Sequence, residues 1–358
     1  MNTKIITAAL AALLFFTCPL GVLSAPQTTA GKPVVRPAVS AKAAVLFSPQ
    51  TGRFLFEKNP DKRLPMASTT KIMTAMVVLE HLPPERVVTV RKEACGVEGS
   101  SLYLQPGEQL TVRQLLEGLM LRSANDAAEM LALETAGSIE AFAALMNDAA
   151  ARLGAVDTHF ENPHGLDGKE HYTTARDLAK IAAAAMKTEL FCEIVGQRSV
   201  RMPSADGGVR VVTNHNKLLH LYDGACGVKT GFTNKCGRCL VGAAKRDGVE
   251  LISVTLAAPD DWNDHKKLFD FGFSFLECRC LAGKGERLSE TEIPGYDAPV
   301  GLVAEEEIRL VLPRGAKIRT EIDLHRPLLL TVPVGTALGT ARFYLDGRQI
   351  ASVRLLLG

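Results

Sequence analysis

The chain of 358 residues has almost no net charge, because 41 lysine and arginine residues face 39 aspartate and glutamate residues, a formal balance of +2. Proteins that bind nucleic acid need a basic stripe, commonly with interleaved aromatic side chains. Aromatic residues make up only 6% of this chain, and short basic pairs such as Lys245-Arg246 are typical of solvated faces. The composition therefore argues against a nucleic-acid-binding protein.

The sequence also lacks an apolar run long enough to cross a membrane. The best candidate follows Lys4 and covers Ile5 to Phe16, whereas hydrocarbon of about 30 Å requires about 20 residues. A short apolar run followed by a small-residue cleavage region, here Ser24-Ala25, is typical of a cleaved secretory signal. We therefore expect a signal peptide over residues 1–25, a Thr-, Pro- and Val-rich linker over residues 26–42, and an exported protein.

Cysteine is scarce, and its count is odd once Cys18 is removed with the signal peptide, because seven of eight cysteines then remain. At least one thiol must stay unpaired within the chain. Cys236 and Cys239 have the spacing of half a zinc site, but Cys278-Arg-Cys280 is a poor second half. We expect buried thiols or a single disulfide, with no metal and no cofactor.

Three short strings carry the chemistry: Ser68-Thr-Thr-Lys71, Ser123-Ala-Asn125 and Lys229-Thr-Gly231. Each occurs once, in this order, with domain-sized gaps between them. Any one alone is a weak signal, but the ordered set is the signature of penicillin-recognising serine enzymes that transfer acyl groups.

The first string predicts a nucleophile and its base. Apolar residues at helical spacing follow it and predict an amphipathic helix that runs to about His81, with Ser68 in its first turn. Lys71 projects from the same face one turn later, so its amine can reach the serine hydroxyl. Taken alone, a serine cap and a solvated lysine are the commoner reading of this pattern.

A lysine acts as a base only when it is neutral. Its reference pKa of about 10.4 must fall by roughly 3 units, which requires about 4 kcal/mol of bias against the cation. Burial and a second positive group provide such a bias. Lys229 is the natural second cation for Lys71.

The other two strings predict the rest of the site. Ser123 can relay a proton and Asn125 can hold a substrate amide, because a short loop between two helices presents both; the next residue, Asp126, is read as an ordinary helix cap. Lys229, Thr230 and Gly231 precede a β-like run, where a strand edge suits an extended peptide. The alternatives are an ordinary capped loop and a surface strand.

The chain resembles the low-molecular-mass penicillin-binding proteins, the D-alanyl-D-alanine carboxypeptidases of peptidase family S11. The resemblance spans about Ala43 to Phe275. It rests on Ser68-Thr-Thr-Lys-Ile-Met-Thr-Ala75, Ser123-Ala-Asn-Asp-Ala-Ala128, Asn162-Pro-His-Gly-Leu166, His171-Tyr-Thr-Thr-Ala-Arg-Asp177 and Asp223-Gly-Ala-Cys-Gly-Val-Lys-Thr-Gly231.

This resemblance implies removal of the terminal D-Ala from peptidoglycan stem pentapeptides through an acyl-enzyme, inhibition by β-lactams, and action in the cell wall or periplasm. It implies that Ser68 is the nucleophile, Lys71 the general base, and Ser123 with Asn125 the second catalytic element. Lys229, Thr230, Gly231 and Phe232 would bind the substrate, with the N–H groups of Ser68 and Phe232 as the oxyanion hole.

The chain departs from the family pattern at Phe232, where members often carry histidine. Members also often have an arginine some fifteen residues before the Lys-Thr-Gly string that helps to anchor the substrate carboxylate. The nearest equivalent region here reads Thr213-Asn-His-Asn-Lys217. The anchor for the substrate carboxylate beyond Lys229 is therefore open, with His215 and Lys217 as candidates.

Class A β-lactamases need a glutamate in an E-x-x-L-N setting, which Phe160-Glu-Asn-Pro-His-Gly-Leu166 does not provide. We therefore expect slow release of penicillin. A DD-endopeptidase and a non-catalytic protein that binds cell-wall peptides remain alternatives.

The order of patterns predicts an α/β (α+β) transpeptidase/β-lactamase-like catalytic domain over residues 43–280. Its antiparallel sheet joins a hairpin near the start, Ala43–Phe47 and Arg53–Glu57, to strands between Val209 and Leu256, around a helical subdomain. A small all-β, sandwich-like domain is expected over residues 285–358, with a type I′ turn at Asp346-Gly347. Family members commonly end in an amphipathic membrane-surface helix, which the end of this sequence does not show, so peripheral membrane association is left open.

Overall fold

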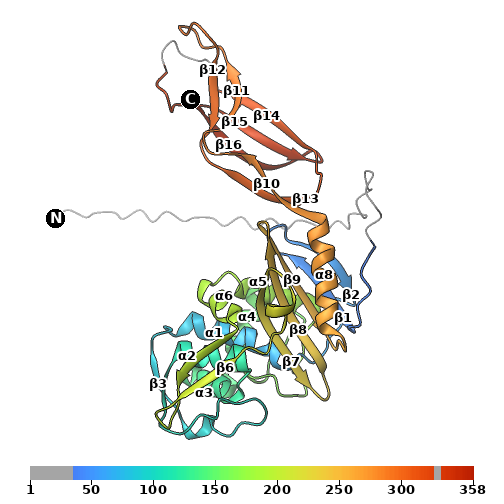
Figure 1. Ribbon diagram of the computed structural model, residues 1–358, viewed down its shortest axis with the longest axis vertical. Coiled ribbons are helices and arrows are strands. Elements are labelled where there is room, and N and C mark those ends of the chain that lie inside the picture. Colours follow the sequence, from blue (N-terminus) through green and yellow to red (C-terminus); the bar gives the residue numbers. More distant parts are fainter. Residues whose placement is uncertain (1–34, 326–331) are drawn as a thin grey trace, which may run out of the picture. The chain divides into compact units, whose positions relative to one another are not determined.

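The computed structural model describes residues 35–325 and 332–358 (Figure 1). The predicted signal peptide, most of the predicted linker and most of a strand expected over residues 328–332 lie outside these ranges. The central element is a five-stranded antiparallel sheet with the order β2-β1-β9-β8-β7. Its strands are β1 (Ala43–Ser48), β2 (Arg53–Lys58), β7 (Ala225–Thr233), β8 (Gly237–Arg246) and β9 (Val249–Leu256).

The sheet is covered on both faces, which explains why its inner strand β1 is apolar on both faces. Alternate residues of a strand point to opposite faces: Ala43 and Val45 of β1 belong to the core beneath the helical subdomain, while Ala44 and Leu46 pack with the residues of α8. Both sets are therefore buried, and β1 reads as a continuous hydrophobic run.

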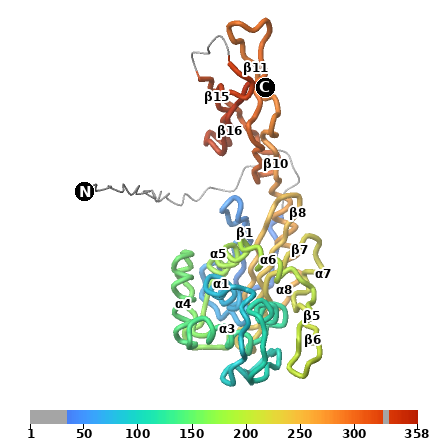
Figure 2. Tube along the Cα trace, turned by 90° about the vertical axis from the view of Figure 1, so that its left-hand side faces the viewer, coloured from blue at the N-terminus to red at the C-terminus, as the bar shows by residue number. Residues whose placement is uncertain are grey.

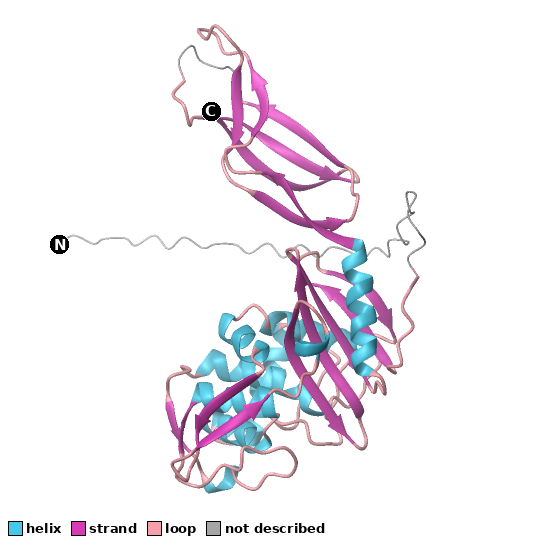
Figure 3. Cartoon of the chain, in the orientation of Figure 1, coloured by secondary structure: helices cyan, strands magenta, loops and turns pink. Residues whose placement is uncertain are grey.

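The helices fall into two groups (Figure 3). The sequence predicts a closing helix over Trp262 to Leu276. The structure confirms it as α8 (Asp261–Phe275), which packs against β8 and β9. On the other face α1, α3, α4 and α5 form a contiguous bundle, in which α1 touches each of the others (Figure 2). The bounds of the α-helices other than α8 are α1 (Lys71–His81), α2 (Val112–Glu117), α3 (Asn125–Ala136), α4 (Ile139–Arg152), α5 (Ala175–Ala185), α6 (Glu189–Gly196) and α7 (Leu218–Leu221).

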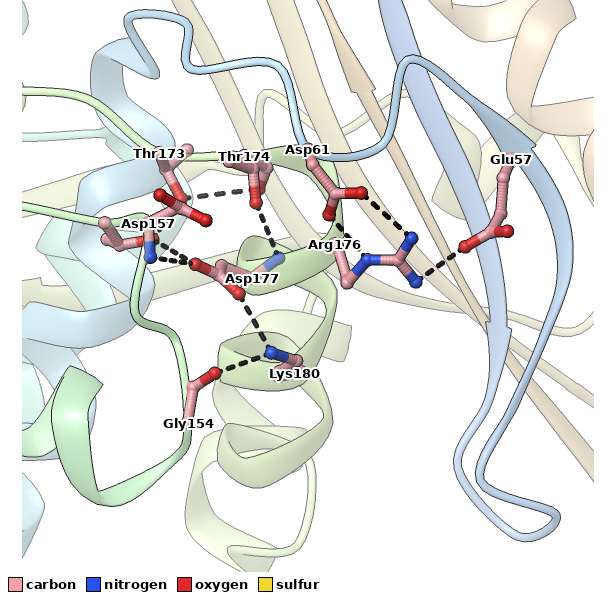
Figure 4. Close-up of polar contacts among 10 residues, drawn as sticks. Glu57, Asp61, Gly154, Asp157, Thr173, Thr174, Arg176, Asp177 and Lys180 are labelled. Atoms are coloured by element: carbon pink, nitrogen blue, oxygen red, sulfur yellow. Dashed lines mark hydrogen bonds and ion pairs between the residues drawn. The ribbon is translucent and has the colours of Figure 1, made fainter. Parts of the chain in front are cut away.

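A polar network fixes the start of α5 against the helical subdomain and β2 (Figure 4). The Asp177 carboxylate accepts from Asp157 N at 2.8 Å and pairs with Lys180 Nζ at 3.0 Å. Arg176 pairs with Asp61 and with Glu57, each at 2.6 Å. Arg176 and Asp177 belong to the His171–Asp177 motif, which is thus held by contacts with distant segments. The bridge between Leu64 and Thr173 places this motif beside the chain that leads to Ser68.

The C-terminal strands form their own core, which is lined by Phe343 and Leu355 among others. One sheet has the order β11-β12-β16-β15-β14, and β10 pairs with β13. The Asp346-Gly347 turn has positive φ at both residues, 49° and 77°, which confirms the predicted type I′ hairpin. The strands are β10 (Leu276–Ala282), β11 (Arg287–Thr291), β12 (Val300–Ala304), β13 (Ile308–Pro313), β14 (Ile318–Leu324), β15 (Ala337–Leu345) and β16 (Arg348–Leu357).

Several short elements were not predicted. They are the two-stranded pairs β3 (Val87–Thr89) with β4 (Gln109–Thr111) and β5 (Ser199–Pro203) with β6 (Val209–Thr213); β6 coincides with the start of the predicted strand region. Such two-stranded ribbons carry little hydrophobic periodicity because most of their residues are exposed. None of the helices within the described ranges combines the length and the apolar content that a membrane crossing requires.

Candidate active site

Ser68 and Lys71 lie one helical turn apart, as the sequence predicts. Ser68 belongs to a 3₁₀ turn, η1 (Ala67–Thr70), which leads directly into α1 at Lys71. The Lys71 Nζ atom is 3.1 Å from Ser68 Oγ. The hydroxyl reaches the cleft while the lysine is fully buried, so the amine approaches the serine from beneath.

Two further contacts define the state of Lys71. Its Nζ donates to Asn125 Oδ1 at 2.7 Å and to the His164 backbone carbonyl at 2.6 Å. A neutral amine has two N–H donors and one lone pair, and these three partners use all of them if the Ser68 hydroxyl donates to the lone pair. The geometry therefore fits a base that is ready to accept the serine proton.

The electrostatics also favour the neutral amine. Burial lowers the pKa of Lys71 well below its ordinary value, and the positive charge of Lys229 lowers it further, while Asp126 acts in the opposite direction. Burial alone lowers the pKa of Lys229 to about 7. Lys229 is 1% exposed and its Nζ donates to its neighbour's carbonyl, Thr230 O, at 2.9 Å, so both lysines lie below the cleft surface.

The second string sits on an irregular turn between two helices. A π-helical turn over Gly118–Arg122 ends at Ser123, whose φ of 64° is left-handed, and α3 then begins at Asn125. Ser123 lines the cleft. Asn125 lies behind it, where its side chain binds both Lys71 Nζ and the Glu98 carbonyl.

Asp126 is not the predicted helix cap, because the N-cap of α3 is Ala124 and Asp126 lies in the first turn. Its buried carboxylate accepts from Ser101 Oγ at 2.6 Å and from the backbone N–H groups of Leu102 and Leu104 at 3.0 and 3.1 Å. Asp126 therefore holds the loop that brings Ser100 to the cleft. The predicted cap was wrong because the partners of Asp126 lie more than twenty residues away in sequence.

Strand β7 forms the opposite wall. It is the last strand of its sheet, so one edge is free of strand partners among the described residues. A Cβ on Gly231 would lie 3.1 Å from Met66 O, Ser68 N and Thr69 N, and glycine therefore lets β7 pass close to the nucleophile's backbone. The next side chain, Phe232, is 63% exposed.

The segment around Gly165 supports the nucleophile from below. Asn162 Oδ1 accepts from Gly165 N at 2.7 Å, and Gly165 has φ +88°, with a virtual Cβ only 2.0 Å from Ala67 O. This close approach presents the His164 carbonyl to Lys71. Sequence reasoning quoted this motif without assigning it a role, because a backbone carbonyl leaves no mark on residue type.

The cleft between these walls has a volume of about 340 Å³. Its lining includes the predicted Thr230 and both expected candidates for a carboxylate anchor, His215 and Lys217. It also includes residues that sequence reasoning missed. The complete lining is Ser68, Ser100, Ser123, His215, Lys217, Thr230, Gly231, Phe232, Arg238, Asp261 and Trp262.

Arg238 is the most firmly held of the missed residues. Its Nε and Nη2 atoms donate to Asp261 Oδ1 at 3.0 and 2.7 Å, and its guanidinium lies 5.5 Å from the Trp262 ring centroid. Arg238 pairs with Phe232 in the β7–β8 register. The sequence signal that could have placed Arg238 in the cleft was its position seven residues after Gly231, across a short turn.

The family of the chain follows from comparison with known proteins. The model of the D-alanyl-D-alanine carboxypeptidase family, peptidase S11, matches residues 27–260. The chain belongs to this family. It is similar to D-alanyl-D-alanine carboxypeptidase DacF of Bacillus subtilis, with 32% identity over 90% of this chain and 86% of the relative.

Solved structures of two S11-type proteins are similar as well. D-alanyl-D-alanine carboxypeptidase DacD of Francisella tularensis matches 92% of this chain and 96% of its own, with a TM-score of 0.66 and 26% identity. A variant of the Streptomyces K15 DD-transpeptidase matches 67% of this chain and all of its own, with a TM-score of 0.64 and 37% identity. The predicted α/β transpeptidase-like fold with a following β part is confirmed.

Within this S11 carboxypeptidase, the contacts also bear on the β-lactamase alternative. Glu161, the glutamate in the stretch that was compared with the β-lactamase pattern, is exposed and its carboxylate lies against Gly168. The position beside Lys71 is taken by the His164 carbonyl. A carbonyl can hold the lysine but cannot accept a proton from water at neutral pH, and the His164 imidazole contacts Glu129 at 3.1 Å.

Proposed function

We propose that the protein removes the terminal D-Ala from peptidoglycan stem pentapeptides through an acyl-enzyme on Ser68. The observation that supports this proposal most strongly is the 3.1 Å contact between Ser68 Oγ and the buried Lys71 Nζ. Asn125 and the His164 carbonyl hold the amine in place. The same geometry accounts for the expected acylation by β-lactams. Their strained amide presents a carbonyl to the same nucleophile.

In each half of the reaction, acylation and deacylation, a proton is transferred as bonds to the carbonyl carbon form and break. Lys71 takes the Ser68 proton as Oγ attacks the carbonyl between the two D-Ala residues, and the oxyanion is bound by the N–H groups of Ser68 and Phe232. The proton then passes to the leaving amine, with Ser123 as the cleft-side relay. Water next attacks the acyl-enzyme, Lys71 accepts its proton, and Ser68 regains a proton as the ester breaks.

The substrate lies extended along the free edge of β7. A peptide added to a strand edge gains main-chain hydrogen bonds while its side chains alternate between the walls. Its D-Ala carboxylate then reaches the end of the cleft where Thr230 and Arg238 lie. We assign Arg238 as the cation that meets this carboxylate, because Asp261 and Trp262 preorganise the guanidinium and leave some of its N–H donors free.

The stem-peptide substrate implies a site of action at the extracytoplasmic face of the envelope. Family S11 acts on cell-wall peptides, and the predicted signal peptide supports export of this member. No nucleic-acid partner is proposed. Peripheral association with the membrane stays open.

Incubation with diacetyl-L-Lys-D-Ala-D-Ala tests the activity. We expect catalytic release of one D-Ala per peptide, measured by amino-acid analysis, and a penicillin adduct on Ser68 that persists in intact-protein mass spectra. Absence of D-Ala release would leave an endopeptidase acting on cross-linked peptides or a binding protein. Rapid turnover of penicillin without a lasting adduct would favour a β-lactamase.

Replacement of Arg238 by glutamine tests the carboxylate anchor. Loss of one charge-assisted hydrogen bond should reduce kcat/KM for the peptide by about 10- to 100-fold, mainly through KM. Lys217→Gln, which removes the competing candidate, should change kcat/KM by less than about 3-fold.

Lys235→Gln is the matched control, because Lys235 is exposed on the same hairpin and does not line the cleft. A larger loss for Lys217→Gln than for Arg238→Gln would transfer the anchor to Lys217.

A further inference from the structure

Two buried thiols lie next to the active site and take no part in the proposed reaction. The Cys236 and Cys239 Sγ atoms are 3.1 Å apart, and the two residues are 4% and 0% exposed. A disulfide needs a separation of about 2.0 Å. The two sulfurs therefore need to move about 1 Å closer to form the bond.

The pair flanks Arg238, the second residue of strand β8. Cys236 directly precedes β8, Cys239 lies within it opposite Gly231, and Gly237-Arg238 lies between them. Cys236 Sγ is also 3.0 Å from the Pro65 carbonyl. The thiols thus lie between the start of β8, which carries Arg238, and the segment that leads from Pro65 to Ser68 three residues later.

A metal does not explain this pair. A structural zinc site requires four ligands, and no group of three or more His, Cys, Asp or Glu side chains suited to a metal occurs in residues 35–325 and 332–358. The thiols that sequence spacing suggested as the other half lie on β10: Cys278 packs against Gly248, and Cys280 Sγ is 3.8 Å from Glu307. Neither of these contacts involves Cys236 or Cys239.

The chemistry of the pair suits oxidation. The neighbouring Cys236 thiol lowers the pKa of Cys239, and the thiolate is the form that attacks a disulfide. A Cys-x-x-Cys pair in an oxidising compartment finds disulfide donors during folding, before burial closes access.

We propose that Cys236 and Cys239 form a disulfide in the exported enzyme and that this bond fixes Arg238 in the cleft. One thiolate attacks a donor disulfide and releases one donor thiol, and the second thiolate then displaces the other. Two cysteine thiols lose two protons and two electrons, and the donor disulfide becomes two thiols. The consequence for Arg238 rests on the proposed function, whereas the bond itself does not.

Peptide mapping of the full chain after export into an oxidising periplasm tests the bond. The protein is denatured in iodoacetamide without reductant and digested. We expect Cys236 and Cys239 to escape alkylation and their peptides to be two hydrogens lighter than the thiol form, while Cys278 and Cys280 are alkylated in the same sample. Alkylation of Cys236 and Cys239, or pairing of either with another cysteine, would overturn the proposal.

Kinetics test the consequence for the site. Enzyme made in a reducing cytoplasm is unfolded and refolded in two samples, one without and one with oxidised glutathione. The kinetic constants of the two samples are then compared. We expect the disulfide form to have a KM about 3- to 10-fold lower for diacetyl-L-Lys-D-Ala-D-Ala with kcat changed less than 2-fold, since a preorganised turn lowers the cost of binding.

The double variant Cys236→Ser/Cys239→Ser, which retains the hydrogen-bonding shape of the pair, should show no such response. A mapped disulfide with unchanged KM would overturn the link to Arg238. Failure of all forms to release D-Ala would instead refute the proposed function, since the mapping does not depend on activity.

Discussion

Replacement of Ser68 by alanine is expected to reduce D-Ala release by a factor of about 10⁴ or more and to abolish covalent labelling by penicillin. The reason is that Ser68 Oγ is the hydroxyl in contact with the buried Lys71 amine and it opens into the cleft. Without it no acyl-enzyme can form, and only binding and the oxyanion hole remain to assist direct attack by water.

The measurement is steady-state release of D-Ala, together with intact mass after incubation with penicillin. Ser199→Ala is a matched control, because Ser199 is exposed on β5 and does not line the cleft. It should retain full activity and labelling. Labelling that survives in Ser68→Ala would place the nucleophile elsewhere and would contradict the mechanism.

Replacement of Lys71 by methionine or by arginine is expected to reduce acylation by about 10³- to 10⁴-fold. Methionine removes the amine. Arginine keeps a positive charge, but its pKa above 12 prevents it from acting as a base. If Lys71 acted only as a cation, arginine would preserve much of the rate, so the arginine variant separates the two roles. The rate is read from stopped-flow penicillin acylation.

The pH dependence of the intact enzyme carries the same information. Since the reactive amine is neutral, kcat/KM should rise with pH through the lowered pKa of Lys71 and reach its plateau well below pH 10.5. The positive charge of Lys229 lowers that pKa, so Lys229→Met should move the rising limb to higher pH. A limb that stays in place, in a variant shown to be folded by circular dichroism, would contradict coupling of the two lysines.

The sequence predicted the parts of the site that depend on local spacing. The Ser68–Lys71 pair follows from the helical period, and the convergence of three motifs follows from the resemblance to a known family. The predicted hairpin of β1 and β2, the closing helix α8 and the Asp346-Gly347 turn were confirmed for the same reason. Each depends on apolar periodicity or on turn chemistry that neighbouring residues supply.

The parts that were missed depend on contacts between distant segments. The His164 carbonyl reaches Lys71 across 93 residues, and its backbone atom is common to every residue type. Arg238 becomes a cleft residue only because β8 pairs with β7 and α8 brings Asp261 to it. The proximity of the two thiols was equally hidden, since spacing alone could not distinguish half a metal site from a pair.

The free edge of β7 carries a risk as well as an opportunity. Any extended segment, including the same strand of a second copy, could pair with the backbone groups that we propose for substrate binding, and open strand edges are common starting points for aggregation. The opposite wall limits this danger, because Ser100, Ser123 and His215 lie across the cleft from β7. The proposed substrate site and the risk of pairing with a second copy therefore share one strand edge.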